Sequence, residues 1–194
     1  MGLDAYEYSC SRGIHLNEES AKELGMEAWL YDIVLSIHAP YYINLSSQEK
    51  DKQERSKRYI LDSLQVARWM GATRVVFHPG ACGKIPRNLA LDTAVKLFRE
   101  CLVLAKEMDL EDIHLCPETM GKRNQLGTLD EVLTLCRLDE RVIPTLDFGH
   151  MHALGSGSLK TKKDYEKILS QVENELGIDR LRRVHIHISR IEYT

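Results

Sequence analysis

Short apolar runs alternate with longer amphipathic segments along the whole chain. Six runs rich in β-branched and aromatic residues predict strands, and segments with helical spacing of apolar residues separate them. The expected strands are Asp4–Cys10, Ile33–Ala39, Thr73–Pro79, Ile113–Glu118, Val142–Asp147 and Arg183–Ser189. The expected helices are Asn17–Tyr31, Gln48–Met70, Asn88–Met108, Thr128–Arg137 and Asp164–Leu176.

The predicted strands are apolar on both faces, which is typical of parallel strands that helices cover. Repeated right-handed βαβ units build either a closed barrel or an open doubly wound sheet. No GxGxxG follows the first strand, so a dinucleotide-binding sheet has little support. A full eight-unit barrel takes about 250 residues. Six strands and five helices therefore predict an incomplete (β/α)8 TIM barrel, in one domain over residues 1–194, that lacks the first and last βα units.

Local signals mark several helix ends. Thr128 and Glu131 have the spacing of a capping box, and Asn88 is a candidate N-cap. Gly71 and Gly177 are candidate C-cap positions. These signals place the predicted helices between the strands.

The composition is that of a globular protein, with 43% hydrophobic and 28% charged residues among 194. No apolar run approaches the roughly 20 residues of a membrane span, and the N-terminus has no signal-peptide pattern. Five scattered cysteines without a CxxC pair predict reduced thiols and a cytoplasmic location. A net charge of −3 gives no overall basic field but allows a local basic groove.

Metal-ligating residue types recur where the predicted strands end. Every unit from the second to the sixth delivers such a residue to the carboxyl end of its strand, the barrel face that holds active sites in this fold. The candidates are His38, His78, Glu118, Asp147 with His150 one turn later, and the pair His185 and His187.

A divalent metal would satisfy this cluster, since converging imidazoles and carboxylates are costly to bury without a partner. The mixed set suits Zn²⁺ and, less specifically, Mn²⁺ or Fe²⁺. A lone strand-end histidine is more often structural, and the two acids are also plausible helix caps. One metal cluster nevertheless explains the matching strand ends better than separate coincidences. His15 and His114 are given no role, and His152 is expected at the surface or behind a ligand.

Five sequence blocks carry a resemblance that covers nearly the whole chain. The blocks are His38–Leu45, Phe77–Ala81, Pro117–Lys122 continuing to Leu126–Glu131, Asp147–Gly155 and His185–Arg190. In these blocks the chain resembles the endonuclease IV family of apurinic/apyrimidinic endonucleases, within the xylose-isomerase-like barrel superfamily.

The resemblance implies up to three zinc ions. His38, His78 and Glu118 resemble the complete set for one ion, with Glu118 as the bridging, catalytic carboxylate. Asp147 and one strand-six histidine resemble part of the second set, and His150 resembles one ligand of the third. His185 and His187 share one face, and His187 is favoured because it lies nearer the strand end.

The chain departs from the family pattern at both ends. The remaining third-ion ligands and a last glutamate would lie beyond Thr194, and the family's first strand is not recognised. One or two bound ions are therefore expected. Whether the chain is a fragment or a whole protein stays open.

The implied activity is cleavage of DNA on the 5′ side of abasic sites, in base excision repair. Tyr41 and Asn44 resemble substrate-side residues, and Lys122 and Arg123 add positive charge to the same rim. Arg12 is a candidate phosphate contact, with a solvated surface arginine as the alternative.

Two other functions remain in view. The first is a metal-dependent sugar isomerase or epimerase of the same superfamily, which usually uses more carboxylates and fewer imidazoles. The second is a truncated metal-binding barrel without turnover. A barrel with two open strand edges is also expected to self-associate.

Overall fold

A parallel β-sheet forms the centre of the molecule. The structure is a computed structural model that describes residues 2–190. The six expected strands are confirmed, each shorter than predicted. They are β1 (Ala5–Ser9), β2 (Val34–His38), β3 (Arg74–Phe77), β5 (His114–Pro117), β7 (Thr145–Asp147) and β8 (His185–His187).

The strands follow one another in chain order across the sheet. Parallel pairing links β1, β2, β3 and β5, and a second parallel pair joins β7 to β8. A single bridge from Glu118 to Thr145 connects the two groups. β7 begins only after Pro144, which has no N–H to donate to a ladder. Two short strands that the pattern did not predict, β4 (Gly80–Ala81) and β6 (Gln125–Leu126), pair antiparallel with each other.

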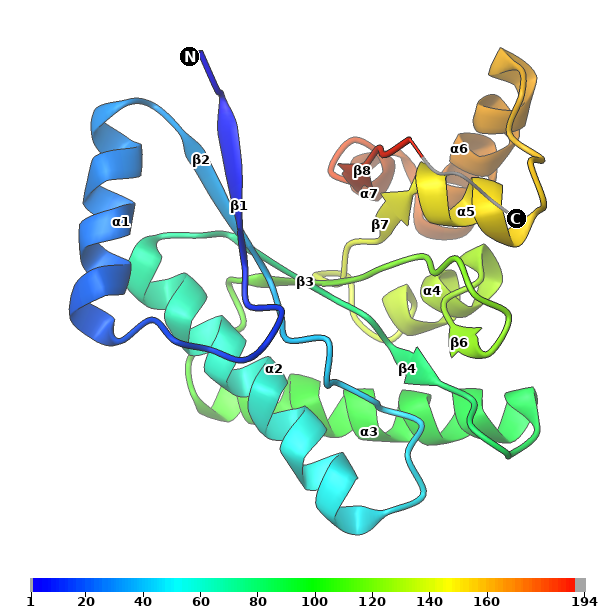
Figure 1. Cartoon of the computed structure of the whole chain (residues 1–194), viewed down its shortest axis with the longest axis horizontal. Helices are drawn as coiled ribbons and strands as arrows, with labels where there is room; N and C mark the ends of the chain where they lie inside the picture. Colours follow the sequence, from blue (N-terminus) through cyan, green and yellow to red (C-terminus); the bar gives the residue numbers. More distant parts are fainter. Residues whose placement is uncertain (1, 191–194) are drawn as a thin grey trace.

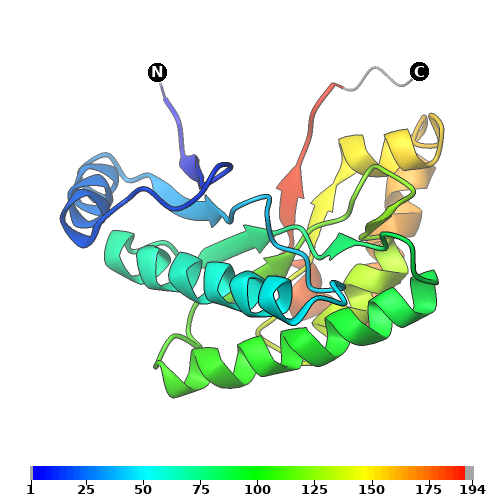
Figure 2. The same cartoon turned by 60° about the horizontal axis from the view of Figure 1, so that its bottom comes forward.

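Seven helices accompany the strands in the described residues, two more than predicted. α2 and α3 run across the outer side of the sheet, and α4 and α6 continue this layer toward the last strands (Figures 1 and 2). The helices are α1 (Glu18–Leu30), α2 (Lys50–Met70), α3 (Arg87–Glu107), α4 (Leu129–Cys136), α5 (Phe148–Leu154), α6 (Lys162–Leu176) and α7 (Ile178–Leu181).

The predicted end signals hold at three of four positions. Thr128 and Glu131 form the expected capping box, and Gly71 ends α2 in the left-handed conformation at φ 70°. Gly177 follows α6 and also precedes α7. Asn88 is not an N-cap, because α3 begins one residue earlier, after Pro86.

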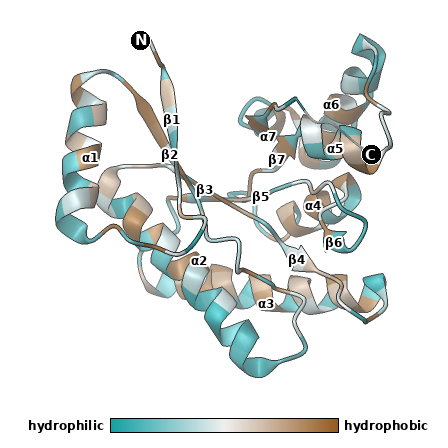
Figure 3. Cartoon of the chain, viewed as in Figure 1, coloured by the Kyte–Doolittle hydropathy of each residue, from teal (hydrophilic) through white to brown (hydrophobic). Residues whose placement is uncertain are grey.

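The main core lies between the sheet and the helices. Hydrophobic and hydrophilic residues alternate along α2 and α3 (Figure 3), and the buried residues of both helices are mostly apolar. Phe77 of β3 packs against Phe98 of α3, with ring centroids 5.3 Å apart, and Leu64 of α2 is fully buried in the same cluster. Val76, Cys116 and Ile143 form a separate, smaller cluster. The packing of helix side chains against the sheet therefore holds in place the strands whose ends carry the candidate ligands.

The five cysteines are free, and all five are buried. Burial raises the pKa of the Cys101 and Cys116 thiols to about 12, which keeps them protonated at neutral pH. Among the helices of residues 2–190, none has the length and apolar character needed to cross a membrane.

Candidate metal centre

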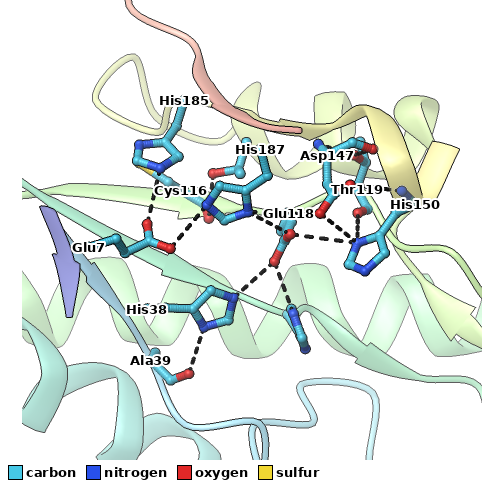
Figure 4. A network of polar contacts seen from close by, with 12 residues as sticks. Glu7, His38, Ala39, Cys116, Glu118, Thr119, Asp147, His150, His185 and His187 are labelled. Carbon is cyan, nitrogen blue, oxygen red and sulfur yellow. Dashed lines mark hydrogen bonds and ion pairs between the residues drawn. The ribbon is translucent and has the colours of Figure 1, made fainter. Parts of the chain in front are cut away.

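Successive strand ends deliver the predicted ligands to one place. His38 is the last residue of β2, and Asp147 and His187 are the last residues of β7 and β8. Glu118 follows β5 directly, and His78 follows β3. The close-up in Figure 4 shows side chains from β2, β5, β7 and β8 pointing toward one another. The structure thus brings together residues that lie far apart in the sequence.

Glu118 is the centre of this arrangement and is only 1% exposed. Its Oε2 atom lies 3.1 Å from His38 Nε2 and 2.9 Å from His78 Nε2. Its Oε1 atom lies 2.9 Å from His187 Nδ1 and 3.6 Å from His150 Nδ1. One buried carboxylate therefore faces four imidazole rings.

The tautomer of His38 shows that a cation fits here. His38 Nδ1 lies 3.0 Å from the Ala39 carbonyl oxygen, which can only accept, so Nδ1 carries a proton. In a neutral ring, Nε2 then presents a lone pair to a carboxylate oxygen of Glu118 at 3.1 Å. Two acceptors this close need a proton or a metal cation between them. His38, His78 and Glu118 offer three ligand atoms within 4.8 Å of one another, a donor set that suits Zn²⁺.

A second group shares Glu118 and adds Asp147 and His187, again with ligand atoms within 4.8 Å. Asp147 Oδ2 lies 3.9 Å from His187 Nδ1. Its Oδ1 accepts a hydrogen bond of 2.7 Å from the His150 main-chain N–H and so caps α5. Asp147 can therefore cap the helix through Oδ1 and still offer Oδ2 as a ligand atom. Of the two histidines of β8, His187 is the one beside Glu118.

His150 lies at the edge of the cluster. Its Nδ1 atom donates to the Thr119 carbonyl oxygen at 2.9 Å, which leaves Nε2 as the acceptor nitrogen. Within residues 2–190, no group of three ligand atoms includes His150. Within the described residues, His150 therefore lies beside the ligand groups without joining one.

The electrostatics of the cluster follow from burial and from carboxylate–imidazole contacts. Burial raises the pKa of Glu118, but hydrogen bonds from His187, His38 and His78 hold it well below its usual range. Burial lowers the pKa of His187, yet contacts with Glu118 and Glu7 raise it to about 10. Burial raises the pKa of Asp147. Without a metal ion the cluster therefore holds an extra proton on the His187 ring at neutral pH.

Glu7 of β1 is a contact that the sequence interpretation missed. Its two carboxylate oxygens lie 3.0 Å from His185 Nε2 and 3.0 Å from His187 Nε2 (Figure 4). The interpretation considered only strand ends, and Glu7 lies in the middle of its strand. An acid at an inward-facing strand position was the available signal.

A pocket of about 810 Å³ opens over the cluster, and Tyr41 and Lys122 line it beside the ligands. The Tyr41 ring stacks on His78, with centroids 4.9 Å apart and planes at 5°. Lys122 is exposed at the rim. Both residues therefore lie where a substrate above the ligands would meet them.

Two predicted substrate residues lie elsewhere. Asn44 does not line this pocket, because its Oδ1 atom accepts from the Ala81 main-chain N–H at 3.1 Å and from Ser46 Oγ at 2.8 Å. A Cβ at Gly80, where φ is +133°, would collide with the same Oδ1 atom. Asn44 thus holds the β2–α2 loop against β4. Arg12 is exposed and does not line the pocket, in keeping with a surface arginine.

A family model and individual known sequences both match this chain. A model described as the xylose isomerase-like TIM barrel matches residues 1–192. An uncharacterised protein of Methanocaldococcus jannaschii is 35% identical over 193 residues, which cover the whole chain and 69% of that protein. A probable endonuclease 4 of Staphylococcus carnosus is 27% identical over 91% of the chain and 58% of its own length. The chain thus spans little more than half of that relative.

Solved structures share the fold. A D-tagatose 3-epimerase-like protein matches with a TM-score of 0.75 at 23% identity, over 95% of this chain and 66% of that one. Endonuclease IV from Thermus thermophilus matches with a TM-score of 0.70 at 19% identity, over 98% and 84%. The resemblance to endonuclease IV and the incomplete α/β barrel are confirmed. The chain therefore belongs to the xylose isomerase-like TIM barrel family.

Proposed function

We propose that the chain is a metal-dependent phosphodiesterase of the endonuclease IV type, which cleaves DNA on the 5′ side of abasic sites. The observation that carries the proposal is the buried Glu118 carboxylate with imidazoles from three strands around it. Such a histidine-rich set favours Zn²⁺, with Mn²⁺ as the next candidate. Relatives named probable endonuclease 4 support DNA as the substrate.

Each residue has a definite part in this proposal. Bound divalent ions supply Lewis acidity toward a phosphodiester. Glu118, His38 and His78 would together hold one such ion. Tyr41 keeps the His78 ring in place by stacking on it. Lys122 at the rim attracts the phosphate backbone, a contact that positions DNA without reading its sequence.

A duplex oligonucleotide with one stable abasic analogue tests the proposal. Zinc-loaded protein should cut the lesion strand on its 5′ side, and Glu118→Gln should reduce the rate by at least about 100-fold, as loss of a metal-site carboxylate commonly does. Glu173→Gln, on the exposed face of α6, is the matched control and should cut normally. Folded, zinc-loaded protein that leaves the duplex intact would refute the proposal.

A sugar isomerase or epimerase is the second candidate. The similarity to a D-tagatose 3-epimerase-like structure favours it, as do three carboxylates, Glu7, Glu118 and Asp147, that line one pocket. Conversion of a ketose by the metal-loaded protein would support this function over the nuclease. Bound metal with neither activity would favour a metal-binding barrel without turnover. The cytoplasmic location stays a prediction.

A further inference from the structure

Two titratable side chains, Glu7 and His185, lie two residues before the ends of their strands, deeper in the barrel interior than the candidate ligands. Because side chains alternate along a strand, the residue two positions before each strand-end ligand faces the same interior. At most strands this residue is uncharged: Ser36, Val76, Cys116 and Thr145. On the last strand it is His185, below His187, and the matching position of the first strand, below its last residue Ser9, is Glu7. Apolar side chains usually fill barrel layers, so charged groups here need a partner.

Glu7 and His185 meet each other across the barrel. Glu7 Oε2 lies 3.0 Å from His185 Nε2, and Glu7 Oε1 lies 3.0 Å from His187 Nε2. Ser36 Oγ donates a further hydrogen bond of 3.3 Å to Glu7 Oε2. The Glu7, His185 and His187 side chains are 24%, 15% and 23% exposed, so water reaches the group only in part.

We infer that Glu7, His185 and His187 form a site for a divalent transition-metal ion, separate from the set of His38, His78 and Glu118. Their ligand atoms lie within 4.8 Å of one another. Two imidazoles and one carboxylate are the protein ligands of many zinc sites and of non-haem iron sites. Glu7 is not among the ligands that the resemblance to endonuclease IV implies.

The ion at this site joins the two ends of the strand order. β1 pairs only with β2, and β8 only with β7, in the part of the chain that the structure describes. No backbone pairing therefore connects β1 to β8, whereas Glu7 comes from one and both histidines from the other. A shared ion holds these strands together and stabilises the folded state, since the unfolded chain has no preformed site.

His187 decides how many ions bind at once. Its Nε2 atom faces Glu7, and its Nδ1 atom faces Glu118 and Asp147. A neutral imidazole has one lone pair, so His187 serves one ion at a time. The two groups that share no residue are the set centred on Glu118 with His38 and His78, and the set formed by Glu7 with the β8 histidines. The chain therefore holds two ions in these sets together.

Zinc content per chain distinguishes the two uses of His187. The protein is loaded with excess zinc, separated from free metal and measured by elemental analysis. Glu7→Gln and His185→Gln should each lose about one of two ions, because each removes one ligand of the same set. Glu173→Gln on the exposed face of α6 is the matched control and should keep both ions. Asp147→Asn probes the competing group that shares His187 and should also keep both, since asparagine still caps the helix.

Thermal unfolding provides a second readout that needs no substrate. Zinc at about 100-fold above its dissociation constant should raise the midpoint of the parent by roughly 5 °C or more, and Glu7→Gln should lose most of this gain. The inference is overturned if Glu7→Gln keeps both ions while Asp147→Asn loses one, since Glu7 then only orients His187. A parent without zinc overturns it as well. DNA cleavage enters neither readout, so a failed nuclease assay leaves the inference standing.

Discussion

Glu118 combines burial with contacts to histidines from three strands, which makes it the most sensitive residue of the site. Glu118→Gln keeps the shape of the side chain but removes its charge. We expect the variant to fold like the parent, with matching circular dichroism, and to bind at least one zinc ion fewer. Glu173→Gln on α6 is the control. Unchanged metal content in Glu118→Gln would show that Glu118 is not a ligand.

Zinc affinity should depend steeply on pH. The pKa of His187 in the metal-free protein is about 10, because contacts with Glu118 and Glu7 outweigh burial, and the pKa of His38 is also raised. Zinc must therefore displace the proton that His187 holds at neutral pH. The apparent affinity should rise about tenfold per pH unit for each proton released. Competition with a chromophoric chelator at pH 6, 7 and 8 measures this, and a flat profile would contradict it.

The strand-end positions of the candidate ligands were predictable because the end of a strand is visible in a single sequence. Glu118 and Asp147 follow apolar runs, and parallel strands place such positions on one face. Glu7 was not predictable in the same way, because its importance depends on the approach of β1 to β8. Asn44 shows the opposite error, since its neighbour β4 is too short to leave a pattern.

At the scale of elements, one ion pair connects α3, α4 and the rim of the pocket. Glu131 Oε1 accepts from Arg87 Nε at 2.5 Å, and Glu131 Oε2 accepts from the Gly127 main-chain N–H at 2.8 Å. Arg87 also donates to the carbonyl oxygen of Gln125 in β6 at 2.7 Å. Gln125 lines the pocket, so this ion pair positions part of the candidate site.

Removing the acid should loosen this connection. Glu131→Ala leaves the Gly127 and Thr128 N–H groups without their acceptor, which costs about 2 kcal/mol. The thermal midpoint should fall by about 4–8 °C for a domain of this size. Glu173→Ala on the outer face of α6 should change the midpoint little. Equal midpoints for the two variants would contradict the role of Glu131.

The same residue gives a pH dependence of stability. Burial raises the pKa of Glu131, but Arg87 and the Gly127 and Thr128 N–H groups lower it below the ordinary value of 4.5. A lowered folded pKa contributes stability above the unfolded pKa, and this stability is lost as pH falls through the folded pKa. Acid titration of chemical stability should therefore show a smaller loss in Glu131→Gln than in the parent. An identical loss would exclude the contribution of Glu131.

Helix α5 explains why element prediction was incomplete. It has seven residues, too few for apolar periodicity to appear, and it begins at the cap that Asp147 provides. The longer helices α2 and α3 repeat the pattern over 21 residues each, so the sequence predicted them well. Length, together with an end signal such as the capping box of the eight-residue α4, therefore determined which helices could be predicted.

At the scale of the whole molecule, the open edges of the sheet lead to a prediction about association. β1 has one strand neighbour in the described residues, and Tyr6 and Val34 near this edge are exposed. We propose that the chain self-associates through such an edge. Sedimentation should show concentration-dependent oligomers, and Tyr6→Lys should reduce them, because an edge lysine disfavours strand pairing. A monodisperse monomer of the parent would contradict this.

Metal content per chain tests the central claim most directly. Protein purified without chelator should contain about two zinc ions by elemental analysis, one in the set centred on Glu118 and one in the set of Glu7, His185 and His187. Parent protein that remains without divalent metal after exposure to excess zinc would contradict the account. The histidines around Glu118 would then be a hydrogen-bonded cluster and not a metal centre.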